Sequence, residues 1–265
     1  MTSSSAEEHV STLDTSVPHS ARVWNYWLGG KDNFAVDREA GDRVRAVFPA
    51  IVDNARAQRA FLGRAVRYLA GERGIRQFLD LGTGLPTADN THEIAQSVAP
   101  ESRIVYVDND PLVLVHARAL LASSPQGITD YVDADVRDTD LILAQAGRVL
   151  EFDQPVAVIM LGILGNIPDY DDACSVVARF VAALPSGSYL VVNDGTDSSD
   201  EIAKGAGVSN AGGHGYALRR PEQIARYFDG LDLDEPGVVP TTRWRREQAD
   251  GEAALDGYCG VARKP

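Results

Sequence analysis

The sequence predicts an α/β fold built on a doubly wound, mostly parallel sheet. Between residues 76 and 190, five short runs rich in β-branched residues alternate with segments of helical periodicity. Several of these runs are almost entirely apolar, which is typical of strands covered by helices on both faces. Each connection is long enough to contain a helix, so consecutive strands should lie parallel.

The predicted strands come at regular intervals along the chain. They are "RQFLDLG" (76–82), "RIVYVD" (103–108), "ITDYVDAD" (128–135), "PVAVIML" (155–161) and "SYLVVND" (188–194). A helical segment follows each of the first four. In the last of these segments, "DACSVVARFVAAL", apolar residues recur at the spacing of one helix face.

The C-terminal end departs from this alternation. "PEQIARYFDG" (221–230) predicts a helix, with Pro221 near its start and Gly230 at its end. Residues 231–239 and 257–263 then follow as strand candidates with no helical pattern between them. Two strands joined in this way should form an antiparallel hairpin. Five parallel strands and this hairpin together give a seven-stranded sheet.

The chain should form one domain after a short tail. Residues 1–16 are rich in Ser, Thr and Glu, and we expect them to be disordered. No Gly/Ser linker or repeat divides residues 17–265. Within this domain, residues 17–75 should form an N-terminal helical cap or lid, and residues 76–265 a Rossmann-like core.

Composition and charge argue against several classes of partner. The formal charge of −13 disfavours contact with a phosphate backbone or an anionic membrane surface. The basic cluster Arg243, Arg245 and Arg246 could contact nucleic acid, although a solvated loop is the simpler interpretation. Cys174 and Cys259 are far apart in the sequence, and the histidines are scattered, so no metal site is predicted.

We predict the cellular location of the protein from two features that its sequence lacks, a membrane-spanning run and a signal peptide. No apolar run approaches the roughly 20 residues needed to span a bilayer. The N-terminal stretch "MTSSSAEEHVSTLD" has neither the basic nor the apolar region of a signal peptide. We therefore expect a cytoplasmic protein without a membrane partner.

The first predicted strand ends in a motif that carries chemistry, "FLDLGTGLPT". Asp80, Gly82 and Gly84 form D-x-G-x-G at the carboxyl end of that strand. Ligands of doubly wound sheets bind at this edge, and glycines let the backbone turn sharply and approach a ligand. A single G-x-G is weak evidence, because many turns between a strand and a helix contain one.

Acidic residues at the ends of the next two strands strengthen the prediction of a ligand site at this edge. Asp108, followed by Asn109, is placed to accept both hydroxyls of a ribose. Asp135 and Val136 suit the amino group and the ring of adenine. Asp80 favours a cationic ligand end, such as an α-amino group or a sulfonium. These features together fit S-adenosylmethionine better than a nicotinamide dinucleotide.

Alternative interpretations remain for the motif and for each acid. A dinucleotide fingerprint would need glycine where Thr87 stands, and "GGKD" lacks the earlier glycine and the Ser or Thr of a phosphate-binding loop. Asp80 could simply cap a turn, and Asp108 could serve the start of a helix. Asp135 could pair with Arg137.

The sequence also resembles the S-adenosylmethionine-dependent methyltransferase family formerly called DUF574. The resemblance runs from about residue 18 to residue 265. It rests on "YWLGGKDNFAVDRE", "DLGTGLPTADNTHEIAQ", "VDNDPLVLVHARALL", "RYFDGLDLDEPGVVPTTRW" and "GYCGVARKP". It implies a class I methyltransferase fold and S-adenosylmethionine binding, and no defined substrate. "GAGVSNAGGHGYALRR" (205–220) departs from the family pattern, because it should be less helical and is richer in glycine.

The residues that contact the acceptor are harder to predict. Asn166 and Asp169 follow the fourth strand, although they could merely build a turn around Pro168. His214 and Tyr216 lie in the glycine-rich segment after the fifth strand, where a histidine could act as a general base. These four are the candidates for chemistry.

The segment "ARVWNYWLGGKDNF" (21–34) predicts a packing helix that stops at two glycines. Lys31 and Asp32 then offer opposite charges, which would suit the zwitterionic methionine end of the cofactor. We expect this segment to fold over the cofactor with Tyr26, Lys31 and Asn33 nearest to it.

The leading functional prediction is methyl transfer from S-adenosylmethionine to a small-molecule acceptor, with S-adenosylhomocysteine as product. The alternative is a regulatory protein that binds either compound without transferring the methyl group, because the sequence offers no obvious base. A protein or nucleic-acid acceptor is disfavoured by the charge.

Overall fold

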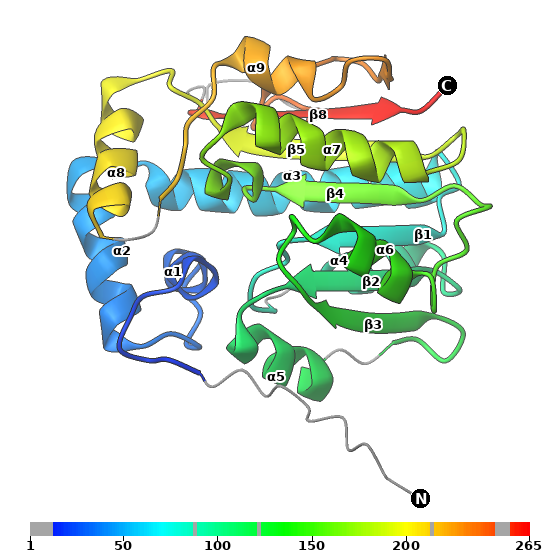
Figure 1. The fold of residues 1–265 in the computed structure, drawn as a ribbon, viewed down its shortest axis with the longest axis horizontal. Coiled ribbons are helices and arrows are strands. Elements are labelled where there is room, and N and C mark those ends of the chain that lie inside the picture. Colours follow the sequence, from blue (N-terminus) through cyan, green and yellow to red (C-terminus); the bar gives the residue numbers. More distant parts are fainter. Residues whose placement is uncertain (1–12, 87–88, 121–122, 213–214, 247–254) are drawn as a thin grey trace, which may run out of the picture.

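A computed structural model describes residues 13–86, 89–120, 123–212, 215–246 and 255–265. One mixed sheet forms the centre of the molecule, in the order β3-β2-β1-β4-β5-β8-β6, with β7 also paired to β8 (Figure 1). Its strands are β1 Gln77–Leu81, β2 Arg103–Asp108, β3 Ile128–Asp133, β4 Ala157–Leu161, β5 Tyr189–Gly195, β6 Asp232–Leu233, β7 Val239–Pro240 and β8 Gly257–Arg263.

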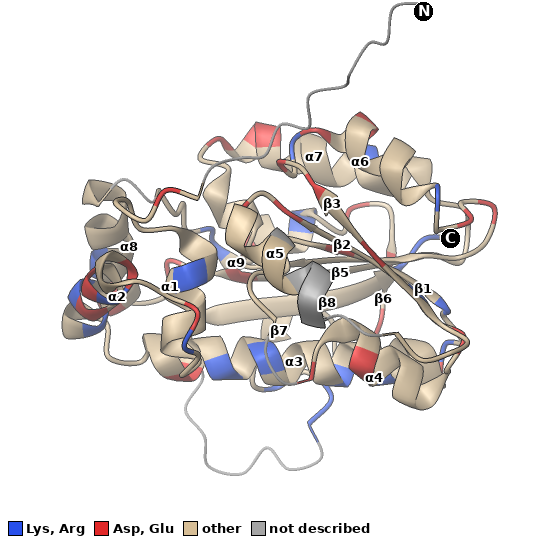
Figure 2. Ribbon diagram, turned by 90° about the horizontal axis from the view of Figure 1, so that it is seen from below, with Lys and Arg blue, Asp and Glu red and all other residues tan. Residues whose placement is uncertain are grey.

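Helices cover both faces of the sheet, with α3 and α4 on one side and α6 and α7 on the other (Figure 2). The helices are α1 Ser20–Trp27, α2 Ala35–Val47, α3 Ile51–Gly71, α4 Thr91–Val98, α5 Pro111–Leu120, α6 Thr139–Ala146, α7 Tyr170–Ala183, α8 Asp200–Ala211 and α9 Pro221–Arg226. A short 3-10 helix, η1, spans Leu164–Asn166.

Alternation along the strands divides the core into two layers. In β1, Phe78 packs into the cluster under α3 and α4, whereas Leu79 and Leu81 pack into the cluster under α6 and α7. All three side chains are fully buried. The strands are therefore apolar on both faces, as the parallel sheet requires. Asp80 points to the same face as Phe78, which brings it toward α3.

The five parallel strands and the antiparallel C-terminal end are confirmed. β8 runs antiparallel to β5, and β6 and β7 share the position on its other side. The sheet thus has seven strand positions, as the sequence predicts. The segment 231–239 is not one continuous strand, because the chain turns at Glu235 and Pro236 between β6 and β7.

The glycine-rich segment is the clearest difference from the expected secondary structure. Its first part, which we expect to be less helical, lies in α8. A Cβ atom built on Gly205 would stand 3.1 Å from Cβ of Phe48, which follows α2. Close packing of α8 against α2 thus favours a small residue at this position, and tertiary contact outweighs glycine's low helix propensity.

Three helices lie beyond the carboxyl ends of the parallel strands, toward which the arrowheads in Figure 1 point. They are α1, α2 and α8. The helix α3, although it falls within the predicted cap, packs along the sheet as part of the core. No helix in the described part of the chain combines the length and apolar character needed to cross a membrane.

Arg245, from the basic cluster near the C-terminus, contacts other parts of the protein. Arg245 stacks 3.7 Å from the ring centre of Tyr68, and its Nη1 atom lies 3.1 Å from Oε2 of Glu72. Trp244, between the exposed Arg243 and Arg245, is fully buried against Phe61 and Tyr68. This arrangement stabilises the packing of α3.

A buried arginine fastens the cap to the core. The side chain of Arg22 is 3% exposed, and its Nε atom lies 3.5 Å from both Asp37 Oδ1 and Asp110 Oδ2. Its two terminal nitrogens donate to the carbonyls of Asp14 and Val17. One side chain on α1 therefore holds α2, the start of α5 and the end of the predicted tail. Residues 1–12 of that tail lie outside the described part.

Replacing Arg22 with methionine should lower the free energy of unfolding by about 3 kcal/mol, because two buried carboxylates would lose their cation. Denaturant unfolding measures this. Arg56→Met is the matched control, since Arg56 is largely exposed and, within the described part of the chain, forms an ion pair with Asp53 on its own helix. Its substitution should change stability by less than about 0.5 kcal/mol. Equal effects of the two substitutions would contradict a structural role for Arg22.

Candidate functional site

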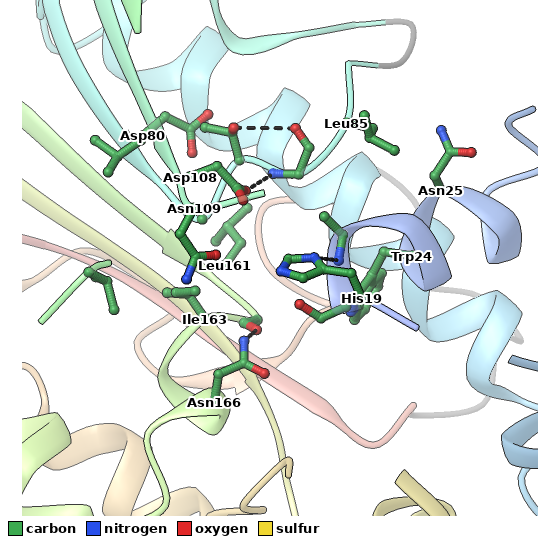
Figure 3. Close-up of a pocket in the computed structure, with 18 of the residues that line it drawn as sticks. His19, Trp24, Asn25, Asp80, Leu85, Asp108, Asn109, Leu161, Ile163 and Asn166 are labelled. Atoms are coloured by element: carbon green, nitrogen blue, oxygen red, sulfur yellow. Dashed lines mark hydrogen bonds between the residues drawn. The ribbon is translucent and has the colours of Figure 1, made fainter. Parts of the chain in front are cut away.

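A cavity of 470 Å³ opens at the carboxyl edge of the sheet, between the ends of β1 to β4 and helices α1 and α3. Its volume is within the range of small-molecule sites. Figure 3 shows residues from the strand ends on one side of it and His19, Trp24 and Asn25 on the other. The cavity brings together most of the predicted cofactor residues, namely Asp80, Gly82, Gly84, Asp108, Asn109, Asp135 and Val136.

Asp80 lies at the centre of this edge and is 7% exposed. Its Oδ2 atom accepts a 2.6 Å hydrogen bond from Thr91 Oγ1, at the start of α4. Burial raises the pKa of Asp80 to about 6, and the Thr91 hydrogen bond and the nearby Arg59 only partly offset that rise. A buried carboxylate of this kind favours a cationic partner.

Gly82 and Gly84 give the loop after β1 its shape. Both have positive φ, +72° and +65°, which other residues adopt at a cost. A Cβ atom on Gly82 would also stand 2.7 Å from the side chain of Ile163. The loop thus passes close to the segment after β4. The amide of Gly84 donates 2.8 Å to Asp108 Oδ2, which fixes the loop to β2.

Asp108 and Asp110 have separate roles. The Oδ1 atom of Asp108 accepts from the amide of Asp110 at 3.0 Å, so each of its oxygens already binds one amide. A carboxylate has further lone pairs, and Asp108 lines the cavity with the exposed Asn109. Burial raises the pKa of Asp108. Asp110 instead faces the cap, where Nδ1 of His19 lies 3.0 Å from its Oδ2.

Asp135 adopts the alternative that the sequence left open. Its carboxylate accepts from Nε and Nη2 of Arg137 at 2.8 and 2.6 Å, and this pairing lowers its pKa. Both residues nonetheless line the cavity, together with the buried Val136. The end of β3 thus presents an ion pair beside an apolar side chain.

The N-terminal segment covers the cavity with different residues from those expected. Trp24, Asn25 and Leu28 line it, whereas Tyr26, Lys31 and Asn33 do not. Successive helical residues point about 100° apart, so Trp24 and Leu28 share a face and Tyr26 lies on another. The hydroxyl of Tyr26 donates 2.8 Å to Asp42 on α2.

Asn25 organises the Gly-Gly-Lys-Asp-Asn loop that follows. Its Oδ1 atom accepts from the amide of Asp32 and from Nδ2 of Asn33, at 3.1 and 2.9 Å. Asp32 Oδ1 lies 3.6 Å from Nε2 of His116 on α5. Lys31 is exposed. The loop therefore packs beside α5, and its asparagine and aspartate serve the fold of the cap.

The four residues expected to contact the acceptor lie in different places in the structure. Asn166 is exposed and lines the cavity. Asp169 does not line it, since its carboxylate caps α7 by accepting from the amides of Asp171 and Asp172. Tyr216 lies in a neighbouring cavity, hydrogen bonded to Asp194. His214 lies outside the described residues.

The structure adds residues that the sequence analysis did not single out. Gln58 and Arg59, on α3, line the cavity. Arg59 donates 2.9 Å to Asn90 Oδ1 and lies close to Asp80. On α3, Arg59 lies one turn from Ala55 and from Leu62, which are both buried, and a charged residue on an apolar helix face is the signal that the sequence offers. Among the described residues, no group of three or more His, Cys, Asp or Glu side chains could hold a metal ion.

Comparisons with known proteins agree with this geometry. A model of the S-adenosyl methyltransferase family matches residues 6–265. A DUF574 family protein from Streptomyces avermitilis MA-4680 is 45% identical with a TM-score of 0.92, over 96% of this chain and 100% of that one. A "putative methyltransferase" from Thermobifida fusca YX is 43% identical with a TM-score of 0.88, over 95% of this chain and 96% of that one.

A more distant structure shares the fold. Human N-acetylserotonin methyltransferase in complex with SAM has 16% identity and a TM-score of 0.50, over 87% of this chain and 58% of that one. A search of curated proteins gave no match. The fold is that of class I methyltransferases, and the family model spans almost the whole chain. The chain belongs to the S-adenosyl methyltransferase family.

Proposed function

We propose that the protein transfers the methyl group of S-adenosylmethionine, bound in the 470 Å³ cavity, to a small-molecule acceptor. One observation supports this most directly. The ends of three adjacent parallel strands each bring a carboxylate to the same cavity, Asp80 from β1, Asp108 from β2 and Asp135 just after β3. The cavity is lined by residues from the ends of all four strands β1 to β4, so its lining extends along the sheet edge.

Each strand end would bind one part of the cofactor. Asp108 would accept the ribose hydroxyls, with Asn109 beside it. Asp135 and Val136 would hold the adenine amino group and ring. Asp80 would bind the α-ammonium group of the methionine part, and Arg59 would bind its carboxylate. Each charged group of the methionine part would then lie next to a side chain of opposite charge. The loop at Gly82 and Gly84 would let the backbone approach the methionine part.

The sulfonium of S-adenosylmethionine supplies an already activated methyl group, so the chain mainly positions the two reactants. Trp24 and Leu28 close the cavity on the side opposite the sheet. Gln58 and Asn166 line its far end, where β4 and α3 meet, and can orient an acceptor by hydrogen bonds. Exclusion of water by the cap would strengthen these polar contacts.

Substituting Asp108 with asparagine should weaken S-adenosylmethionine binding by roughly ten- to a hundredfold, because a charged acceptor of hydrogen bonds is lost. Calorimetry measures the affinity. Asp169→Asn is the matched control. That carboxylate also follows a parallel strand but only caps α7, so its removal should leave the affinity unchanged. Unchanged binding in both folded variants would contradict the proposed ribose contact.

The affinity for S-adenosylmethionine should rise about tenfold between pH 5 and pH 7, because a pKa of about 6 leaves Asp80 largely protonated at pH 5. The cationic ligand prefers the ionised carboxylate, so binding should release protons in this range. Asp80→Asn should abolish the dependence. Methylthioadenosine, which lacks the amino-acid end, is the control ligand. A similar pH dependence for both ligands would rule out the ammonium contact.

Incubation with labelled S-adenosylmethionine and the low-molecular-mass fraction of a cell extract should yield a labelled small molecule and S-adenosylhomocysteine. A high negative charge disfavours nucleic-acid acceptors, which is why the small-molecule fraction is used. The macromolecular fraction serves as the comparison. Tight cofactor binding with no product from either fraction would favour a regulatory protein instead.

A further inference from the structure

A second cavity adjoins the first and has a different character. It measures 120 Å³ and lies between α1, α2, α8 and the ends of β4 and β5. Its walls are mainly apolar, with Val23, Trp27, Val44, Phe48 and Ile202 among them. Five residues line both cavities and mark their junction, namely Ser20, Trp24, Gln58, Gly162 and Asn166. A space of this size holds about one aromatic ring.

One wall of this cavity carries an unusual carboxylate. Asp194, near the end of β5, is 1% exposed. Its Oδ1 atom accepts from the hydroxyl of Tyr216 and from the amide of Gly195. Its Oδ2 atom is buried and makes no hydrogen bond of normal geometry to any residue that the structure describes, although the amide of Gly165 lies near enough to the carboxylate to lower its pKa. An unsatisfied buried carboxylate oxygen is costly, so a donor from outside the chain is expected there.

The ring of Tyr216 packs directly against the backbone of two glycines. A Cβ atom on Gly165, in η1, would stand 2.4 Å from the tyrosine ring, and one on Gly195 would stand 3.2 Å from it. The ring thus fills a slot between two glycines, one of which directly precedes Asn166. This slot places the Asp194–Tyr216 pair beside the segment that borders both cavities.

Resting on the proposed methyltransferase function, we propose that the second cavity binds the acceptor as a neutral, compact and mainly apolar alcohol or phenol, whose proton passes to Asp194. The acceptor oxygen forms a bond to the methyl carbon, and the carbon–sulfur bond breaks. The sulfur keeps the electron pair, and the hydroxyl proton moves to Oδ2 of Asp194 and later to solvent. The products are a methyl ether and S-adenosylhomocysteine.

The charges of the cavity favour a hydroxyl over an aliphatic amine. Next to a carboxylate, such an amine would stay as an ammonium ion, which has no lone pair for the methyl group. Burial raises the pKa of Asp194 to about 6, partly offset by Tyr216 and Arg219, so the group is ionised at neutral pH yet able to take a proton. The pKa of Tyr216 is raised, which keeps its hydroxyl a donor.

The test uses 4-fluorophenol as probe and fluorobenzene as its comparison, with fluorine NMR and protein saturated with S-adenosylhomocysteine. We expect the phenol to bind about tenfold more tightly, because it donates to a buried charge. Asp194→Asn should remove most of this preference, and Tyr216→Phe should reduce it. Equal binding of both probes to the wild-type protein would overturn the role of Asp194.

Two alanines on α8 provide an independent test of whether the acceptor binds in the second cavity. Ala206 lines the cavity, whereas Ala203 is exposed on the same helix. Ala206→Trp should weaken 4-fluorophenol binding by roughly tenfold or more, and Ala203→Trp should not. Both variants should still bind S-adenosylhomocysteine. Probe binding that resists Ala206→Trp overturns this proposal alone, whereas wild-type protein that fails to bind S-adenosylhomocysteine overturns the proposed function.

Discussion

The arrangement of the site depends on one buried cluster of charges. Arg22 lies between Asp37 and Asp110, and all three side chains are almost completely removed from solvent. Burying charges is costly unless their partners and hydrogen bonds are well placed. Here Asp37 also accepts from the amides of His19 and Phe34, so the anion is shared by three parts of the cap. The cluster therefore fixes where α1 crosses the sheet edge.

This cluster connects the cap to the ligand-binding edge by a very short path. Asp110 follows Asp108 by two residues, and the two carboxylates contact different segments, Asp110 the cap and Asp108 the loop after β1. The cap is therefore attached at the strand end where a ribose would bind. Trp24, two residues after Arg22 and on the same helix, is thereby held between the two cavities.

The strand ends could be predicted because they depend on local rules. Short apolar runs between helical segments, glycines after β1 and acids at successive strand ends are visible in the sequence, and they lead to Asp80, Asp108 and Asp135. That Arg59 lines the cavity could not be predicted in this way, because its position depends on how α3 lies across β1. Which face of α1 lines the cavity could not be predicted either, because an apolar stripe does not say which neighbour it meets. For that reason the expectation that Tyr26 lies nearest the cofactor differs from the structure, in which Trp24 and Leu28 line the cavity.

The two buried carboxylates, Asp80 on β1 and Asp194 on β5, would act differently in the proposed reaction. Before transfer, the site would hold a sulfonium cation and the anion of Asp194; after transfer, it would hold a neutral thioether and a neutral acid. In a medium of low dielectric constant, loss of such a charge pair is favourable, because neither ion is well solvated. Asp80 would face a different group, the α-ammonium, whose charge does not change. Its carboxylate would therefore bind the cofactor without opposing the reaction, whereas Asp194 would take part in it.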